Sequence, residues 1–455
     1  MKRTLLMMMA VLLTLSVHAQ RQVYQSTTPE FTVTIPDQGG DGRCVVLVPG
    51  GGYNHIAGAH EGKDWIPFFT SQGIAVVVTK YTLPAGDREK PLGDLRATFQ
   101  YLREHGSKWG INPNGIGIMG FSAGGHLAAA YTNSMLGDQR PAFCILMYPV
   151  VHLDTRQHLG MAKKFLGDDP SDALRKAWST NQMVSAETPA TILIAADDDP
   201  TIDPSNSADY YAALKKQRAQ PATLHIYPSG GHGFGFRTSF PYHDNMTRDL
   251  TDWLKTVQVP GPHAKKVACI GNSITFGAGL KFRYVEGYPA QLQALLGNGY
   301  WVKNFGISGT TMTDGQKDYK RTTRWREAKE FCPDIVTIKL GTNDVQPQWW
   351  KGEEAFTENY QQLIDELRAL PSKPHIVLCL PVTSFRDKNH LDSDIAGKVI
   401  PLIRQIAKKN KLDVIDLHTP TQDKAALFPD KLHPNAEGEG IIAKALYDYI
   451  KHLKK

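Results

Sequence analysis

The hydrophobic pattern divides the chain into two series in which short apolar runs alternate with stretches of helical periodicity. The first series extends from Thr32 to about Leu254, with helix-like stretches near Trp65 and from Leu92 onward. Its strand-like runs are CVVLVPG, AVVVTKY, GIGIMGFS, FCILMYPVV, TILIAADD and TLHIYP. Such alternation predicts a doubly wound α/β sheet.

The second series follows a break in the pattern at VPGPHAKK, a stretch rich in Pro, Gly and Lys without hydrophobic periodicity. We place a linker there, at residues 257–263, between one domain at 28–256 and another at 264–455. The strand-like runs of the second series are KVACIGNS, YWVKNFGIS, DIVTIKLG, HIVLCLPV and LDVIDLH. They predict another three-layer α/β unit, with motifs unlike those of the first.

The first nineteen residues have the pattern of a secretory signal. Lys2 and Arg3 precede an apolar run from Leu5 to Val17, and small residues come before Gln20. This run is shorter than the roughly 20 apolar residues of a membrane span, and no later segment reaches that length. We therefore expect cleavage after Ala19 and a secreted or periplasmic enzyme without a membrane partner.

Charge and cysteine content bear on the protein's partners and on whether it contains disulfide bonds. The formal net charge is +6, and charged residues are scattered along the chain, which does not indicate a nucleic-acid partner. Four of the five cysteines, Cys44, Cys144, Cys269 and Cys379, sit inside apolar runs. This placement favours free, buried thiols over a disulfide framework.

A nucleophile motif stands where the first series passes from strand to helix. Ser122 occupies G-x-S-x-G within GIMGFSAGGH, after an apolar strand and before HLAAAYTNSML. A sharp turn at this point lifts the hydroxyl above the sheet edge, and the flanking glycines permit the crowded backbone. The alternative is a plain Gly-rich turn, but strand, motif and helix are all aligned.

Backbone donors for an oxyanion are expected from the upstream loop PGGGYN. The N–H groups of Gly51 and Gly52, together with that of Ala123, can face the charge that develops during acyl transfer.

A base and an acid should follow at the ends of later strands, in the order Ser, Asp, His. His232 lies in GGHGFG, and Asp197, Asp198 and Asp199 follow ILIAA; we select His232 and Asp199. The acidic trio could instead bind a cation, but no further carboxylate or carbonyl signature supports a metal site.

These motifs resemble the α/β-hydrolase superfamily over residues 28–256, and more closely its acetyl-xylan-esterase-like and kynurenine-formamidase-like members. The resemblance implies an α/β-hydrolase fold and favours Asp199 as the acid. The chain departs from the related His-Gly-Gly-Gly loops by having Pro49 before Gly50, a change that keeps the backbone donors.

The second series contains four blocks that are weak singly and specific together. GNSITFG supplies Ser273, NFGISG supplies Gly306, LGTND supplies Asn343, and DKLHPN supplies Asp430 and His433.

In this order they resemble the SGNH, or GDSL-like, hydrolases over residues 264–455. The resemblance implies a three-layer α/β/α, flavodoxin-like fold with Ser273 as nucleophile. It further implies that His433 is the base, Asp430 its orienting acid, and the N–H groups of Ser273 and Gly306 with the Asn343 amide the oxyanion site. Asn272 replaces the Asp of GDS, a variant that looks like the branch containing sialate O-acetylesterases and acetyl xylan esterases.

Two tryptophans, Trp349 and Trp350, follow Asn343 closely. Exposed indole faces stack on sugar rings, so both are candidate substrate-binding residues, although packing in a loop or core is the alternative.

Together the two resemblances imply a carbohydrate esterase that removes O-acetyl groups, from acetyl xylan in the first instance, through acyl-serine intermediates at two sites without a cofactor. Sialate O-acetyl esters are an alternative substrate, as are feruloyl esters or peptides for the first domain. A hypothesis of another class makes one domain a non-catalytic carbohydrate-binding module.

Overall fold

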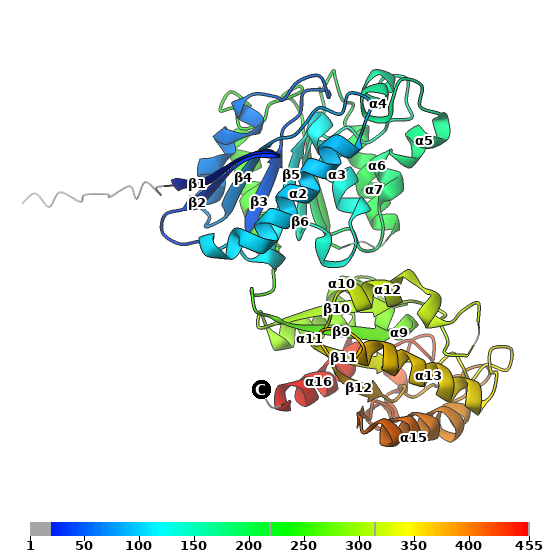
Figure 1. Ribbon diagram of the computed structural model, residues 1–455. Helices are drawn as coiled ribbons and strands as arrows, with labels where there is room; N and C mark the ends of the chain where they lie inside the picture. Colours follow the sequence, from blue (N-terminus) through cyan, green and yellow to red (C-terminus); the bar gives the residue numbers. More distant parts are fainter. Residues whose placement is uncertain (1–19, 218–219, 314, 454–455) are drawn as a thin grey trace, which may run out of the picture.

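The protein contains two separate sheets, one in each half of the chain (Figure 1). The computed structural model describes residues 20–217, 220–313 and 315–453. The predicted signal, residues 1–19, lies outside the described residues.

The first sheet has eight strands in the order β1-β2-β4-β3-β5-β6-β7-β8. From β4 to β8 all neighbours are parallel, whereas β1 and β2 are antiparallel additions at one edge. The strands are β1 Gln20–Thr27, β2 Glu30–Pro36, β3 Cys44–Val48, β4 Ala75–Lys80, β5 Ile116–Phe121, β6 Phe143–Met147, β7 Ala190–Ala196 and β8 Ala222–Tyr227.

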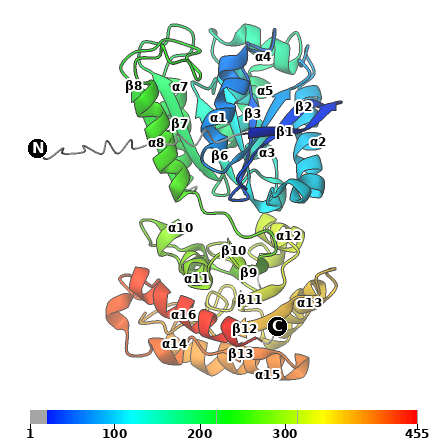
Figure 2. The same cartoon turned by 90° about the vertical axis from the view of Figure 1, so that its left-hand side faces the viewer.

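Helices cover both faces of this sheet because its central strands are apolar on both faces. Alternate residues of a strand point to opposite sides. In β3, Val46 belongs to a core shared with α2, α3 and α7, whereas Val45 belongs to a core shared with α1 and α8. Figure 2 shows α2 and α8 on opposite sides of the sheet. The helices are α1 Ile66–Thr70, α2 Glu89–His105, α3 Ser122–Ser134, α4 Leu159–Leu166, α5 Asp172–Ala177, α6 Thr180–Met183, α7 Ser205–Lys216 and α8 His243–Thr256.

The second sheet is wholly parallel, in the order β10-β9-β11-β12-β13. All five predicted strand runs form strands: β9 Lys265–Gly271, β10 Tyr300–Gly306, β11 Ile335–Lys339, β12 His375–Cys379 and β13 Asp413–Ile415. Ile270 packs with α12, α13 and α15 on one face, and Val267 with α11 and α16 on the other. The helices are α9 Ser273–Phe276, α10 Arg283–Glu286, α11 Tyr288–Leu296, α12 Thr323–Glu330, α13 Glu353–Arg368, α14 Asp392–Asp394, α15 Ile400–Asn410 and α16 Ala436–His452.

The four cysteines predicted inside apolar runs lie in β3, β6, β9 and β12, and all four are buried. Within the described ranges, no helix combines the length and the apolar character needed to cross a membrane.

The segment between the two units is held from both sides. Asn114 Nδ2 donates to the Gly261 carbonyl at 3.3 Å, and the Gly261 N–H donates to the Asn298 carbonyl at 2.8 Å. A partly buried ion pair joins the units directly, since the Arg324 guanidinium on α12 contacts both Glu187 of the first unit and, at 3.0 Å, Glu327 of its own helix.

Arg324→Ala is expected to lower the free energy of unfolding by about 3 kcal/mol, because it removes the cation that both carboxylates contact. Burial acts to raise the pKa of Glu187, but the charge of Arg324 and its hydrogen bond outweigh burial and lower that pKa. A lowered pKa contributes stability above the ordinary carboxyl pKa of about 4.3 and loses it at lower pH, so the penalty should shrink in acid.

Urea unfolding at pH 7 and pH 4 measures this effect. Arg326→Ala is the matched control, because the Arg326 side chain on the same helix is 59% exposed and its pair with Glu330 lies at 3.9 Å. Such a surface pair contributes at most about 1 kcal/mol. Equal losses for the two variants would contradict the prediction.

Candidate active sites

Ser122 is the first residue of α3 and follows β5 directly. Its φ of +53° lies in the left-handed region, where strain is tolerated mainly at functional sites. Close packing maintains the turn, because a Cβ on Gly120 would lie 2.4 Å from the Gly124 carbonyl oxygen. The sequence thus forms the predicted strand, sharp turn and helix around a serine that is 8% exposed.

The structure brings Ser122, His232 and Asp199 together in one line of hydrogen bonds. The Ser122 hydroxyl lies 2.8 Å from His232 Nε2, and His232 Nδ1 lies 2.7 Å from Asp199 Oδ2. Since a carboxylate only accepts, Nδ1 carries the proton and Nε2 is left to accept from the serine. This arrangement can deprotonate Ser122 for attack on an ester.

The three successive aspartates have different partners. Asp199 Oδ1 accepts from the N–H groups of Thr201 and Ile202, at 2.8 and 2.9 Å, which fixes the other oxygen on His232. Asp198 Oδ1 instead accepts from the Gly231 N–H at 2.8 Å and so holds the loop that contains His232. The selection of Asp199 from the trio therefore agrees with its contact to the imidazole.

The PGGGYN loop lies against the nucleophile. A Cβ on Gly50 would come within 2.9 Å of the Ser122 Cβ, and Gly51 and Gly52 have φ of +115° and +61°. Among the described residues, neither the Gly51 nor the Gly52 N–H has an acceptor, and the Ala123 N–H lies in the first turn of α3. All three predicted donors are thus available to an oxyanion.

Glu61 and Tyr148 support this site and are absent from the sequence prediction. Glu61, 3% exposed, accepts from the Gly50 N–H at 2.8 Å and from the Tyr148 hydroxyl at 2.9 Å. Burial and the nearby Glu61 carboxylate raise the pKa of Tyr148, which stays protonated and also accepts from the Gly235 N–H at 3.0 Å. One buried carboxylate thereby joins the oxyanion loop to the loop of His232.

The segment 151–185 contains the short helices α4, α5 and α6. Phe165 of α4 stacks on Tyr53 of the PGGGYN loop with ring centroids 5.2 Å apart. Tyr53 in turn bonds His126 Nδ1 at 2.8 Å, and His126 Nε2 bonds the Trp178 carbonyl at 2.9 Å. The segment 151–185 is therefore packed onto the PGGGYN loop.

The second site has the same hydrogen-bonded series on a different fold. Ser273 is the first residue of α9 after β9, and its hydroxyl lies 2.8 Å from His433 Nε2. His433 Nδ1 lies 2.7 Å from Asp430 Oδ2. The structure thus brings together the three residues predicted for this site.

Asp430 differs from Asp199 in its surroundings, because its side chain is 46% exposed and that of Asp199 is 0% exposed. Partial burial acts to raise the pKa of Asp430, but hydrogen bonds from the His433 N–H, the His433 imidazole and the Leu432 N–H lower it to about 2. Arg386 adds an ion pair at 3.1 Å. Asp430 is therefore ionised throughout the neutral range.

One predicted oxyanion donor of the second site needs correction. The Gly306 N–H donates to Asn304 Oδ1 at 2.8 Å, so this hydrogen is already engaged. Gly309, in the same NFGISG block, has a φ of +79°, and among the described residues its N–H has no acceptor. Gly309 adjoins Thr310, whose carbonyl accepts from Asn343 Nδ2 at 2.8 Å, and we therefore assign the backbone donor to Gly309 beside Asn343.

Two further side chains hold this oxyanion site and were not predicted. His390 Nε2 lies 3.0 Å from Asn343 Oδ1, so the Asn343 amide nitrogen faces Thr310. One of its two hydrogens bonds the Thr310 carbonyl, and the other is left for an oxyanion. Asp344 Oδ1 accepts from the Met312 and Thr313 N–H groups, at 2.8 and 3.0 Å, and so fixes the loop after Gly309. Burial raises the pKa of Asp344 to about 6.

The two tryptophans have unlike environments. Trp350 packs on Phe356 with ring centroids 6.0 Å apart and borders the core of the second unit. The Lys317 ammonium lies 4.2 Å from the Trp349 ring centroid and occupies one face. Sugar stacking by Trp349 and Trp350 stays a prediction.

Within the described part of the chain, no group of three or more His, Cys, Asp and Glu side chains is arranged to hold a metal ion.

Comparison with known families divides the chain in the same way as the two sheets. The alpha/beta hydrolase fold family matches residues 46–236, and the GDSL-like Lipase/Acylhydrolase family matches residues 269–441. Both predicted fold classes are thereby confirmed.

Individual proteins match over one or both units. An endo-1,4-beta-xylanase B of Butyrivibrio fibrisolvens is 28% identical over 42% of this chain and 32% of its own length. The crystal structure of an acetyl ester-xyloside bifunctional hydrolase from Caldicellulosiruptor lactoaceticus is 30% identical, covers 53% of this chain and 96% of that one, and has a TM-score of 0.48. An acetylxylan esterase of Xylanibacter ruminicola is 39% identical over 99% of this chain and 100% of its own length. Because that similarity extends through both units, the chain belongs to the family of this esterase and is a carboxylic ester hydrolase that joins an alpha/beta hydrolase fold to a GDSL-like domain.

Proposed function

We propose that the protein removes O-acetyl groups from xylan at two separate sites, centred on Ser122 and Ser273. The observation that supports this most directly is the repeated geometry, in which each serine begins a helix 2.8 Å from an imidazole that a carboxylate holds at 2.7 Å. The relative named as an acetylxylan esterase supports the choice of substrate.

The same steps apply at each site. The serine oxygen attacks the acetyl carbonyl while His232 or His433 takes the hydroxyl proton. The resulting oxyanion accepts hydrogen bonds from the free N–H groups of the site. The imidazolium then protonates the departing sugar hydroxyl, which leaves an acetyl-serine. Water, deprotonated by the same imidazole, attacks the acetyl-serine and releases acetate, and the serine recovers its proton.

Two unlike esterases on one chain can act on different acetyl positions of the same polymer, each raising the local concentration of substrate for the other. The signal pattern at residues 1–19 supports a secreted or periplasmic enzyme, for which N-terminal sequencing of the exported protein should begin at Gln20.

Acetate release from acetylated xylo-oligosaccharides, followed by NMR, tests the proposal with wild type, Ser122→Ala, Ser273→Ala and the double variant. We expect each single variant to lose release from a distinct set of acetyl positions and the double variant to lose all release. A single variant with an unchanged product profile would identify its domain as non-catalytic toward xylan. No release by wild type would reject xylan, and O-acetylated sialic acid and feruloyl esters would be assayed next.

A further inference from the structure

The nucleophile of the second site begins a helix of only four residues. α9 extends from Ser273 to Phe276, and the N–H groups of Gly277 and Ala278 both donate to the Ser273 carbonyl, at 3.0 and 2.9 Å. The helix makes little more than one turn, so any shift of Phe276 also moves Ser273. The Ser273 hydroxyl therefore keeps its place against His433 only while the other end of α9 is held.

Several contacts within the second unit hold the middle of α9. Asn304 Nδ2 donates to the Thr275 carbonyl at 2.7 Å, and Thr275 Oγ1 lies 3.0 Å from the Tyr288 hydroxyl oxygen. β10 also packs directly on the helix, because a Cβ on Gly306 would lie 2.2 Å from the Phe276 nitrogen. None of these contacts involves the carbonyl of Phe276, at the end of the helix.

Arg283 of α10 holds this last carbonyl. Its Nη1 donates to the Phe276 carbonyl at 3.4 Å, and its guanidinium carbon lies 4.3 Å from the Phe276 ring centroid. A Cβ on Gly277 would lie 2.8 Å from the Arg283 Cβ, so α10 packs closely against the turn that ends α9. Arg283 is 8% exposed, and an arginine is favourable here because the last carbonyls of a helix lack partners within it.

The same guanidinium also bonds the first unit. Arg283 Nη2 donates to the Ala186 carbonyl at 3.4 Å. Ala186 lies between α6 and β7, next to Glu187, which contacts Arg324 of α12. Burial acts to raise the pKa of Glu187, but positive charges that include Arg324 and Arg283 lower it. Arg283 therefore belongs to the contact between the units as well as to the second site.

The turn of the first unit that contains Ala186 is fixed by side chains. The Ser185 N–H donates to Thr188 Oγ1 at 3.0 Å, and Thr188 Oγ1 donates to Asn133 Oδ1, near the end of α3, at 2.7 Å. Asn133 Nδ2 in turn donates to the Tyr210 hydroxyl oxygen of α7 at 2.9 Å. Two helices of the first unit thus support the turn that Arg283 contacts.

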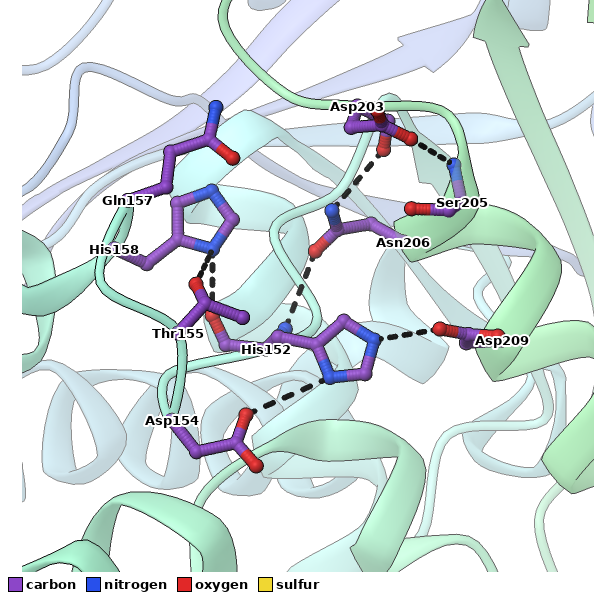
Figure 3. Close-up of a pocket in the computed structure, with 9 residues that line it drawn as sticks. All are labelled: His152, Asp154, Thr155, Gln157, His158, Asp203, Ser205, Asn206 and Asp209. Atoms are coloured by element: carbon purple, nitrogen blue, oxygen red, sulfur yellow. Dashed lines mark hydrogen bonds and ion pairs between the residues drawn. The ribbon is translucent and has the colours of Figure 1, made fainter.

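α7 is itself fixed at its start and reaches the second unit at its end. Asn206 Oδ1 accepts from the His152 N–H at 3.2 Å, and Asp209 Oδ2 lies 2.9 Å from His152 Nε2 (Figure 3). Near the other end of α7, the Lys215 ammonium lies 6.0 Å from the ring centroid of Tyr284 in α10, at the limit of a cation–π contact. The first unit therefore meets α10 from two directions.

From these contacts we infer that Arg283 is a positioning residue for the second site, through which the first unit supports the helix that begins at Ser273. A guanidinium presents its donors as a rigid planar fork, so one side chain can hold the carbonyls of Phe276 and Ala186 together. The inference rests on the proposed function, because it takes Ser273 as a nucleophile. Displacement of a reacting group by about 1 Å can lower its rate by about 10²-fold. Full reactivity of Ser273 therefore requires contact between the two units.

The rate constant at which a fluorophosphonate probe labels Ser273 tests the inference, in the full chain with Ser122→Ala. Arg283→Met keeps an apolar side chain and removes every donor, and we expect the rate constant to fall about tenfold. The fraction of chains finally labelled should not change. A role in stability alone would instead lower that fraction and leave the rate constant as it was, which would overturn the inference.

Two further variants serve as controls. Arg283→Lys should lose less than Arg283→Met, because an ammonium can still donate to one of the two carbonyls. Arg404→Met, in the same unit, should be labelled like the parent, because the Arg404 side chain is 53% exposed and contacts Asp416 at 3.3 Å. A loss in Arg404→Met equal to that in Arg283→Met would count against the inference.

Glu187→Gln weakens the contact from the first unit without altering α9 or Arg283. We expect the rate constant for Ser273 to fall about fivefold, while that for Ser122, measured with Ser273→Ala in place, stays the same. An unchanged rate constant for Ser273 in Glu187→Gln or in Arg283→Met would overturn the inference. The probe contains no sugar, so a chain that is labelled but releases no acetate from xylan would reject the proposed function alone. A parent whose Ser273 takes no label would overturn both.

Discussion

Asp199→Asn is expected to lower turnover at the first site by about 10⁴-fold. The buried Asp199 side chain holds the proton of His232 on Nδ1, so that Nε2 can accept from Ser122. A carboxamide can present its NH₂ group to Nδ1 and thereby move the ring proton to Nε2, where it blocks deprotonation of the serine. The rate of p-nitrophenyl acetate hydrolysis in the Ser273→Ala background measures the loss.

Asp430→Asn, measured in the Ser122→Ala background, is the matched comparison. Because the Asp430 side chain is 46% exposed, water can reach His433 Nδ1 and accept its proton when the carboxylate is gone. We expect a loss nearer about a hundredfold. A larger loss at the second site than at the first would show that burial of the acid does not decide its importance.

Gly51→Ala should lower kcat at the first site by about 10² to 10³-fold, the usual cost of losing an oxyanion donor. With φ at +115°, an added Cβ would lie 2.0 Å from the His55 carbonyl oxygen, so the loop must move. Movement takes the N–H groups of Gly51 and Gly52 away from the carbonyl that Ser122 attacks. Steady-state kinetics in the Ser273→Ala background supply the measurement.

Gly110→Ala controls for backbone strain alone. Gly110 has a φ of +76°, and a Cβ there would meet nothing within 4 Å. Both variants therefore place alanine in a left-handed conformation, but only one disturbs the site. If Gly51→Ala retained normal kcat, the N–H groups of this loop would have no role in stabilising the oxyanion.

The fold was predictable where the burial of a strand on both faces leaves a continuous apolar run in the sequence. Strands such as Cys44–Val48 and Phe143–Met147 are apolar on both faces and were found in place. The edge strand Gln20–Thr27 was missed because its solvent-facing residues are polar and carry no such signal. Its place in the sheet comes from antiparallel pairing with Glu30–Pro36 instead.

The candidate sites were predictable where a residue stands at a strand end within a motif, as Ser122 and Ser273 do. The supporting residues were not, because Glu61 and Tyr148 are 87 positions apart and are joined only by the folded chain. The choice between Gly306 and Gly309 likewise could not come from NFGISG. It depends on which N–H group is already bonded to Asn304.

The two acid–base pairs differ in how far apart their members lie along the chain. Asp199 and His232 are separated by 33 positions, on loops that follow different strands, whereas Asp430 and His433 are separated by 3 within a single turn. The first pair therefore exists only after neighbouring strands have assembled, at the entropic cost of closing a long loop. The second pair is a local unit near the C-terminus. A truncation before Asp430 would therefore remove the acid and the base together, and one grafted turn would carry both of them.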